Sequence, residues 1–216
     1  MKKSKFISII FSTIVCVMMM IGCTTDQNSG QSAQSSGNDD GNKITSLQSV
    51  IDDPNVKDGS EIDLSQYKDI KDFNYNAIIN KSVTIKNGDD LKGAKLEVVT
   101  DGVTLDSIKS ASVTTQSSLK ISSSSLSSLN IGEVSRGRGE ETINPPTVET
   151  DNTTVANKVT VGIENAQIVA ETLMAGEINL TGMNTQLTLK DNESSISKIT
   201  TDTVCQVVLE KGVGTN

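Results

Sequence analysis

The chain has 216 residues and carries 27 acidic against 19 basic side chains, a formal net charge of −8. It contains no histidine or tryptophan, and aromatic residues make up 2% of it. Because an acidic chain is repelled by phosphate backbones and base stacking needs aromatic rings, this composition excludes nucleic acid as a partner.

Residues 1–22 have the pattern of a signal peptide. Three lysines within the first five residues precede an apolar run that is short for a membrane span. The run ends at Met20-Ile21-Gly22-Cys23, and polar sequence begins at once. This segment resembles the lipoprotein signal of bacteria, in its looser spirochaete form, with methionine where leucine is usual. The resemblance implies that Cys23 is lipidated and becomes the first residue of the mature chain.

Residues 23–43 are expected to be the lipidated cysteine and a linker. Within 24–42 no aliphatic residue is larger than Ala33, so this segment buries too little apolar surface to offset its ordering entropy. We expect a disordered tether with a reach of roughly 25 Å. The expected location is therefore the cell envelope, at the outer membrane or cell surface, and the folded domain is expected over 44–216.

The folded part is expected to open with a short helix within 45–53. Leu47, Val50 and Ile51 share one face at helical spacing, and Pro54 ends the pattern. From there the periodicity changes to two, with apolar–polar–apolar triplets separated by Asn-Gly, Asp-Gly or serine-rich turns. These triplets predict strands at 62–64, 83–85, 96–98, 103–105, 119–121, 129–131, 159–161, 178–180, 187–189 and 207–209.

The spacing of apolar residues predicts how the strands stack. Three series recur at intervals of 19 to 21 residues: Leu64, Ile85 and Leu105; Val161, Leu180 and Ile199; and Ile168, Leu187 and Val207. A constant interval of this length is typical of a solenoid, in which each coil stacks its strands on the previous coil at about 4.8 Å. Aliphatic side chains then form columns inside the solenoid.

The segments GSEIDLSQYKDI and INKSVTIKNG resemble the opening coils of right-handed β-helix proteins of the pectate-lyase-like type. The resemblance covers roughly residues 44–131 and 157–210, and it implies that the helix within 45–53 covers the open end of the first coil. The expected fold is therefore all-β, a right-handed parallel β-helix with a short N-terminal capping helix. An antiparallel β-sandwich of the same strands remains the alternative.

Residues 132–157, GEVSRGRGEETINPPTVETDNTTVAN, interrupt the repeat and are expected to form an inserted loop. The loop contains both arginines of the protein. Its charged side chains are candidates for contact with a partner: Arg136, Arg138, Glu140 and Glu141. The alternative is a flexible insertion without a binding role.

The sequence offers little catalytic chemistry. Without histidine there is no Ser-His-Asp or Cys-His set and no imidazole for a metal, and no phosphate-binding glycine motif is present. The likeness to β-helix lyases implies one route, in which carboxylates hold calcium and a basic residue accepts a proton. Asp101 and Asp106 are weak calcium candidates, with Lys86 and Lys109 as bases, although acids beside glycine also suit ordinary turns.

The expected function is that of a lipid-anchored, non-enzymatic subunit that binds or scaffolds protein at the cell surface through its flat faces and loop. Expected partners are the membrane, through the lipid, and another envelope or host protein; no cofactor is expected. Size, lipobox and composition also resemble the small accessory lipoprotein of dentilisin-type surface protease complexes, which implies a lipidated protease as partner. An adhesin and a calcium-dependent polysaccharide lyase remain the alternatives.

Overall fold

The computed structural model describes residues 44–134, 144–191 and 193–210. These ranges contain one α-helix, α1 (Leu47–Ile51), one 3-10 turn, Leu64–Tyr67, and sixteen short strands arranged in two sheets. The first sheet consists of β1 (Glu61–Asp63), β3 (Thr84–Gly88), β5 (Val103–Ile108), β7 (Leu119–Ser122), β10 (Thr147–Asp151), β12 (Gln167–Ala170), β14 (Thr185–Leu189) and β16 (Cys205–Leu209). The second consists of β2 (Ala77–Ile79), β4 (Lys95–Val98), β6 (Ser112–Thr115), β9 (Ser128–Ile131), β11 (Thr153–Val161), β13 (Leu173–Leu180) and β15 (Ser195–Thr201), with β8 (Ser125–Leu126) paired to β11.

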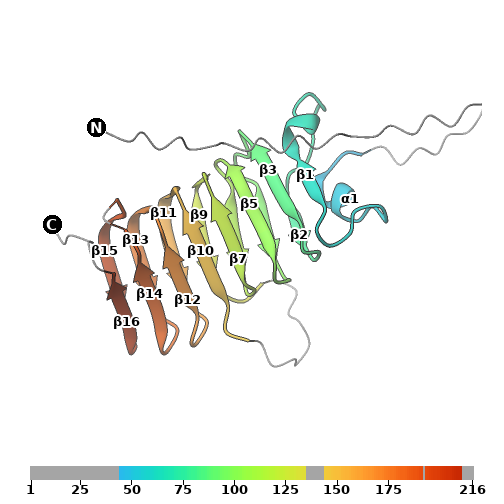
Figure 1. Cartoon of the computed structure of the whole chain (residues 1–216). Coiled ribbons are helices and arrows are strands. Elements are labelled where there is room, and N and C mark those ends of the chain that lie inside the picture. The colour runs from blue at the N-terminus through green and yellow to red at the C-terminus, as the bar shows by residue number, and fades with distance from the viewer. Residues whose placement is uncertain (1–43, 135–143, 192, 211–216) are drawn as a thin grey trace, which may run out of the picture. The chain divides into compact units, whose positions relative to one another are not determined.

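The strands wind into a parallel β-helix. Within the described ranges every strand pair is parallel, and neighbours in each sheet come from successive coils. Figure 1 shows the coils following one another from β1 and β2 to β15 and β16. Because hairpins would give antiparallel pairs, the expected β-helix is confirmed and the sandwich alternative is wrong.

Apolar side chains stack in columns between the two sheets. In the first sheet Ile168 lies opposite Leu187, and Leu187 lies opposite Val207, as the spacing predicted. A second column joins Ile85 to Leu105, both fully buried. The core is therefore built from Val, Ile and Leu, which pack in a narrow tube without large rings.

Two columns differ from the predicted series by two residues. Ile62, not Leu64, pairs with Ile85, because the chain turns into the 3-10 segment at Leu64. At the other end Ile199 pairs with Ile178 and not with Leu180. A shift of two residues keeps a side chain on the same face of its strand, so spacing alone does not distinguish the two registers.

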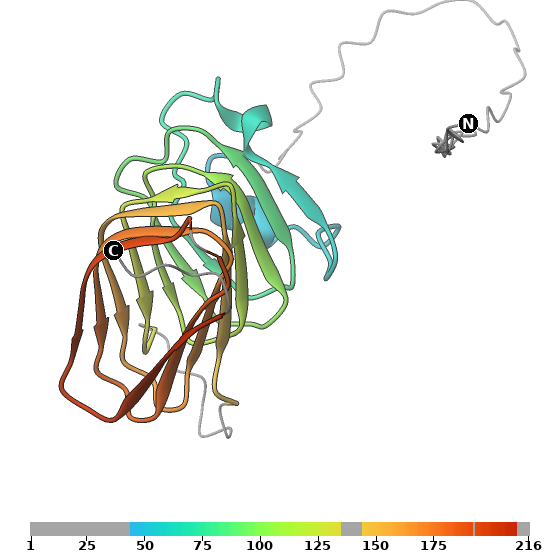
Figure 2. The same cartoon turned by 60° about the vertical axis from the view of Figure 1, so that its left-hand side comes forward.

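The helix α1 covers the first coil, as expected. Its N-cap is Ser46, whose hydroxyl accepts a hydrogen bond from the Ser49 backbone N–H at 3.1 Å. The inward face of α1 is buried through Leu47, Val50 and Ile51. Figure 2 shows the helix against the first coils, at the end opposite β15 and β16. The apolar interior of the first coil is thereby shielded from water.

The inserted loop is shorter than the sequence predicted. Residues 147–151 form β10, and 153–157 belong to β11, so the second half of the range 132–157 is part of the solenoid. Inward positions in this stretch are taken by Val148 and also by the threonines Thr150 and Thr153, all buried. Threonine at a core position hides the apolar–polar–apolar pattern from a hydropathy reading. Residues 135–143 lie outside the described part of the chain.

Candidate functional site

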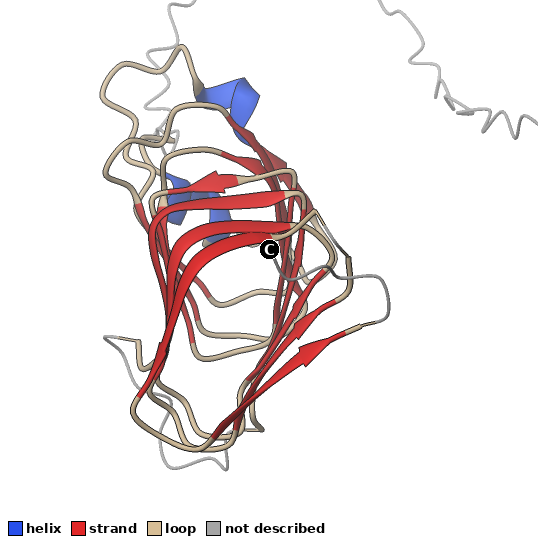
Figure 3. Cartoon of the chain, turned by 90° about the vertical axis from the view of Figure 1, so that its left-hand side faces the viewer, coloured by secondary structure: helices blue, strands red, loops and turns tan. Residues whose placement is uncertain are grey.

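The last described coil, β15 and β16, exposes its inward-facing apolar side chains; we call it the terminal coil. Ile199 is 39% exposed, whereas Ile178, its partner in the preceding coil, is fully buried. Likewise Val207 is 43% exposed above a fully buried Leu187. Figure 3 views the solenoid from this end. The same column position is thus core in one coil and surface in the next.

Exposed apolar residues gather near this end of the solenoid. Among the described residues, the large hydrophobic side chains with high exposure are Ile44, Met174, Met183, Ile199, Val204, Val207 and Leu209. All but Ile44 lie between residues 174 and 209. Scattered single apolar residues need no explanation, but a concentrated set is typical of a surface that binds another molecule.

The terminal coil also presents unpaired strand edges. In the described structure β15 pairs only with β13, and β16 pairs only with β14. The outer edge of each strand therefore has free backbone N–H and C=O groups. Within β15 and β16 the one charged side chain is Lys198, whose Nζ lies 3.8 Å from Glu177 Oε1 of β13, and the turn between the two strands carries the exposed Asp202. Free edges next to exposed aliphatic side chains suit the addition of another β-strand.

The partly buried carboxylate of Asp191 connects the start of the terminal coil to the preceding coil through hydrogen bonds. Asp191 accepts hydrogen bonds from Thr172 Oγ1 at 2.6 Å and from Ser194 Oγ at 3.0 Å. Ser194 Oγ in turn accepts from the Leu173 backbone N–H at 3.1 Å. Burial raises the pKa of Asp191, but the hydrogen bonds from Thr172 and Ser194 outweigh it, so the pKa lies below its ordinary value of 3.8. This network ties the start of β15 to the coil below.

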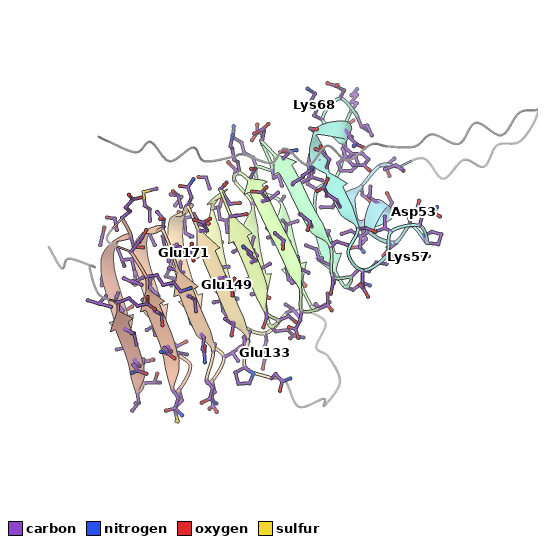
Figure 4. All side chains as sticks on the ribbon, viewed as in Figure 1. Asp53, Lys57, Lys68, Glu133, Glu149 and Glu171 are labelled. Carbon is purple, nitrogen blue, oxygen red and sulfur yellow. The ribbon has the colours of Figure 1, made fainter. Side chains whose placement is uncertain are left out.

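The outer surface of the first sheet carries charged side chains, in contrast to the exposed apolar side chains of the terminal coil. Outward positions on the first sheet carry Lys120, Glu149, Glu171 and Lys190. Lys190 Nζ lies 3.7 Å from Glu171 Oε1, and both side chains are well exposed. Figure 4 shows Glu149 and Glu171 standing on the ribbon of this sheet. Mixed, solvated charges of this kind are typical of an ordinary surface and of weak ion pairs.

The two calcium candidates belong to separate local networks. Asp101 Oδ1 accepts a hydrogen bond from the Ser118 backbone N–H at 2.7 Å, in the turn before β5. Asp106 lies within β5, where its Oδ1 accepts from Ser122 Oγ at 3.1 Å. Over residues 44–134, 144–191 and 193–210, no three His, Cys, Asp or Glu side chains are grouped so that they could hold a metal ion. Each carboxylate has instead a hydrogen-bonding role between neighbouring coils.

The two candidate bases are engaged in ion pairs. Lys86 Nζ lies 2.5 Å from Glu61 Oε1, and Lys109 Nζ lies 2.9 Å from Asp89 Oδ1. The hydrogen bond to Glu61 raises the pKa of Lys86 above 10.5, and nearby Asp63 and Asp106 act in the same direction. A proton acceptor works best with a pKa near neutrality, so the environment of Lys86 is opposite to what a catalytic base needs.

The remaining predicted site residues lie outside the described part of the chain. They are Cys23, the expected lipidation site, and the loop candidates Arg136, Arg138, Glu140 and Glu141. Their roles stay predictions. In the described ranges no helix is long and apolar enough to cross a membrane.

The sequence does not predict the exposure of the terminal coil. It predicts a strand at 207–209, but nothing in Val207 or Leu209 distinguishes them from the buried Leu187 and Leu189. No family model, curated protein or solved structure matches the chain.

Proposed function

We propose that this chain is a lipid-anchored cell-envelope protein that binds another protein chain through its terminal coil and performs no catalysis itself. The observation that carries the proposal is the exposed apolar end of the solenoid, with free edges on β15 and β16. Apolar side chains beside unpaired backbone groups supply both the driving force and the register for docking a strand. In the described part of the first sheet, the outer surface around Glu171 and Lys190 carries solvated charges instead.

The surroundings of the candidate catalytic residues support a role without catalysis. The chain has no histidine. Asp101 and Asp106 are hydrogen-bonded in different places, and Lys86 is held by Glu61 with a raised pKa. No observation on the described residues favours the polysaccharide lyase over a binding role.

The lipid anchor rests on the sequence of residues 15–30. A basic start, an apolar run and a cysteine at the polarity break are typical of a lipoprotein signal. An acyl chain at Cys23 would hold the solenoid near a bilayer by burying methylene groups. The partner is then another protein of the same surface, for which a lipidated surface protease is one case, or a host protein if the chain is an adhesin.

Lipidation is tested by feeding producing cells a clickable palmitate analogue and following label on the purified chain. Label is expected on the natural protein and is expected to disappear in Cys23→Ser. Cys205→Ser is the matched control and should keep the label, because Cys205 lies in β16. An unlabelled natural chain would contradict the anchor and leave the binding role without its expected location.

Protein binding is tested by crosslinking on intact cells followed by purification of the chain. A protein crosslinked to the natural chain should be lost in Val207→Lys, which places a charge in the exposed column. It should be retained in Ile44→Lys, because Ile44 has a similar exposure (39% against 43%) but lies next to α1. Crosslinks that are equal in both variants, or absent from the natural chain, would contradict the proposal. Whether the captured protein comes from the envelope or from the host separates a scaffold from an adhesin.

A further inference from the structure

An extended loop of the first coil projects from the solenoid beside β3. Residues 64–76 connect β1 to β2, whereas residue 152 alone connects β10 to β11 and residues 171–172 connect β12 to β13. Figure 1 shows this loop, with its 3-10 turn, at the end of the solenoid opposite β15 and β16. Because the later coils turn this corner with fewer residues, closing the solenoid does not require the loop. A long loop on a rigid scaffold commonly carries a function of its own.

The loop and the end of β3 line a cavity of about 450 Å³. Its apolar wall includes Phe73 and Tyr75 from the loop and Leu91, which follows β3. The volume lies in the range of pockets that hold small ligands, which are typically lined by apolar and aromatic side chains. Asn87 Nδ2 of β3 donates a hydrogen bond at 3.1 Å to Asp63 Oδ1, at the start of the loop. This bond joins the two walls of the cavity.

The loop carries a cluster of three aromatic rings. Tyr67, Phe73 and Tyr75 are the only aromatic residues after residue 11. The Tyr67 and Phe73 rings stack with their centroids 5.1 Å apart, and the Phe73 and Tyr75 rings meet edge to face at 4.8 Å. Tyr75 is half-buried and borders the cavity, whereas Tyr67 does not. The cavity therefore has an aromatic wall, and the face of such a ring attracts the weakly positive hydrogens of C–H groups.

Polar groups surround this aromatic wall. Lys68 and Asp72 border the cavity from the loop, and Asp89 and Asp90 border it from the segment after β3. Figure 4 labels Lys68 on the loop. Among the described residues, Lys68 Nζ and the Asp72 carboxylate have no hydrogen-bond or ion-pair partner, whereas Asp89 accepts from Lys109 Nζ at 2.9 Å. The cavity thus offers an ammonium donor and a carboxylate acceptor to a ligand, with an excess of negative charge that disfavours an anion.

From these observations we propose that the cavity binds an uncharged pyranose unit of a glycan. A pyranose with equatorial hydroxyls has C–H groups on its two faces and hydroxyls around its edge. The C–H face matches the rings of Phe73 and Tyr75, and the edge hydroxyls can donate to Asp72 and accept from Lys68.

Other ligands fit the cavity less well. A purely apolar ligand would desolvate the charges without pairing them, and an anionic sugar would be repelled by the three carboxylates. A lysine-rich peptide would suit the carboxylates but would bring its ammonium groups near Lys68. The cavity lies at the opposite end of the solenoid from the terminal coil, so this inference goes beyond the proposed function and does not depend on it.

The test is titration of the full chain with cellotriose, a neutral glucose trimer, in a detergent without a sugar head group. Saturable heat in calorimetry and a change of tyrosine fluorescence are expected at millimolar sugar. The chain has no tryptophan, and its two tyrosines are Tyr67 and Tyr75, so this emission reports on the loop. The β-1,4-linked glucuronate trimer, an anionic counterpart, is expected not to bind. No response to cellotriose, or equal binding of the anionic trimer, would overturn the proposal. Trilysine that binds where cellotriose does not would overturn it in favour of a cationic peptide.

Substitutions locate the bound sugar. Tyr75→Leu removes the ring that borders the cavity but keeps an apolar side chain, and Lys68→Met removes the ammonium donor. Each is expected to raise the dissociation constant about threefold to tenfold. Tyr67→Leu is the matched control and should bind like the natural chain, because Tyr67 belongs to the same ring cluster but does not line the cavity.

Val207→Lys should also bind cellotriose like the natural chain, since Val207 lies in the terminal coil. Sugar binding and the proposed protein binding are therefore tested independently, and either can fail without the other. Affinities that are equal in the natural chain, Tyr75→Leu and Lys68→Met would overturn the site. Far-UV circular dichroism shows whether each variant keeps the fold.

Discussion

The hydrogen bonds of Asp191 make the stability of the attachment between the terminal coil and the preceding coil depend on pH. Its pKa is held below 3.8 by hydrogen bonds from Thr172 and Ser194, in spite of burial. The folded state therefore binds fewer protons than the unfolded state near this pH. The stabilisation is fully present above about pH 3.8 and is lost as the pH falls through the folded-state pKa.

We expect Asp191→Asn to lower the free energy of unfolding at pH 7 by about 1–2 kcal/mol, since a charged acceptor is replaced by a neutral one. The difference from the natural chain should shrink as the pH falls from 3.8 toward the lower folded-state pKa of Asp191, because the unfolded state binds the proton first. Thermal unfolding at pH 7 and pH 3 measures both. Asp202→Asn, in the exposed turn between β15 and β16, is the control and should have little effect at either pH. A difference that grows on acidification would contradict the assigned sign.

For single residues, the alternation of apolar and polar side chains predicts which residues point inward. It does not predict which of these are shielded from solvent. The alternation around Val207 predicted an inward side chain correctly. Its 43% exposure depends on the coil that would lie above it, and no property of Val207 or its neighbours encodes that. The calcium candidates illustrate the converse: Asp101 and Asp106 are close in sequence but lie in separate networks, because β5 is extended between them.

Among the elements, α1 is held to the solenoid by its buried apolar face, by Gln48 and by one lysine at its C-terminal end. Lys81 Nζ donates hydrogen bonds to three backbone carbonyls, those of Ile51 at 2.6 Å, Asp53 at 3.0 Å and Val56 at 2.7 Å. The carbonyls at the end of a helix lack partners within it, and a cation there also interacts favourably with the helix dipole. Lys81 thus joins the capping helix and the following loop to the second coil.

We expect Lys81→Met to reduce the free energy of unfolding by about 1.5–3 kcal/mol, the range for hydrogen bonds that involve a charged group. Lys92→Met is the matched control, because Lys92 is 82% exposed and its nearest carboxylate oxygen, on Asp90, is 3.8 Å away. It should change stability by less than about 0.5 kcal/mol. Urea denaturation followed by circular dichroism measures both. Equal effects of the two substitutions would show that the three carbonyls do not depend on Lys81.

Elements with an apolar–polar–apolar core were predictable, and those with polar inward residues were not. The triplets at 103–105 and 187–189 lie within β5 and β14 as predicted. β10 lies in a range where the sequence predicts a loop, because Thr150 takes a core position and two prolines precede the strand. Within β6 the buried Thr115 plays the same part, donating a hydrogen bond to the Ser117 carbonyl at 2.7 Å. Thr115 and Thr153 satisfy their hydroxyls by donating to nearby backbone carbonyls, whereas the buried Thr150 Oγ1 has no hydrogen-bond partner among the described residues.

Over the whole molecule, the burial of the inward side chains falls toward the terminal coil. Leu105 is fully buried in the middle of the first sheet, and Leu209 occupies the same column position at its edge with 42% exposure. Leu105→Ala should therefore lower the free energy of unfolding by about 2–5 kcal/mol. Leu209→Ala should lower it by less than about 1 kcal/mol when measured at low protein concentration. Losses of equal size would mean that the terminal coil is covered in solution.

The solenoid can be lengthened or shortened only by whole coils. Each coil contributes one strand to each sheet, and the paired residues lie 19 to 21 positions apart in the later coils, as in Ile168, Leu187 and Val207, but 16 positions apart between Val103 and Leu119. Removing one such unit from the middle would bring matching rows into contact and shorten the rod by about 4.8 Å. A deletion one residue longer or shorter would turn polar side chains toward the axis. Variants of this protein that differ in solenoid length are thus expected to differ by whole coils of roughly 16 to 21 residues, with both ends retained.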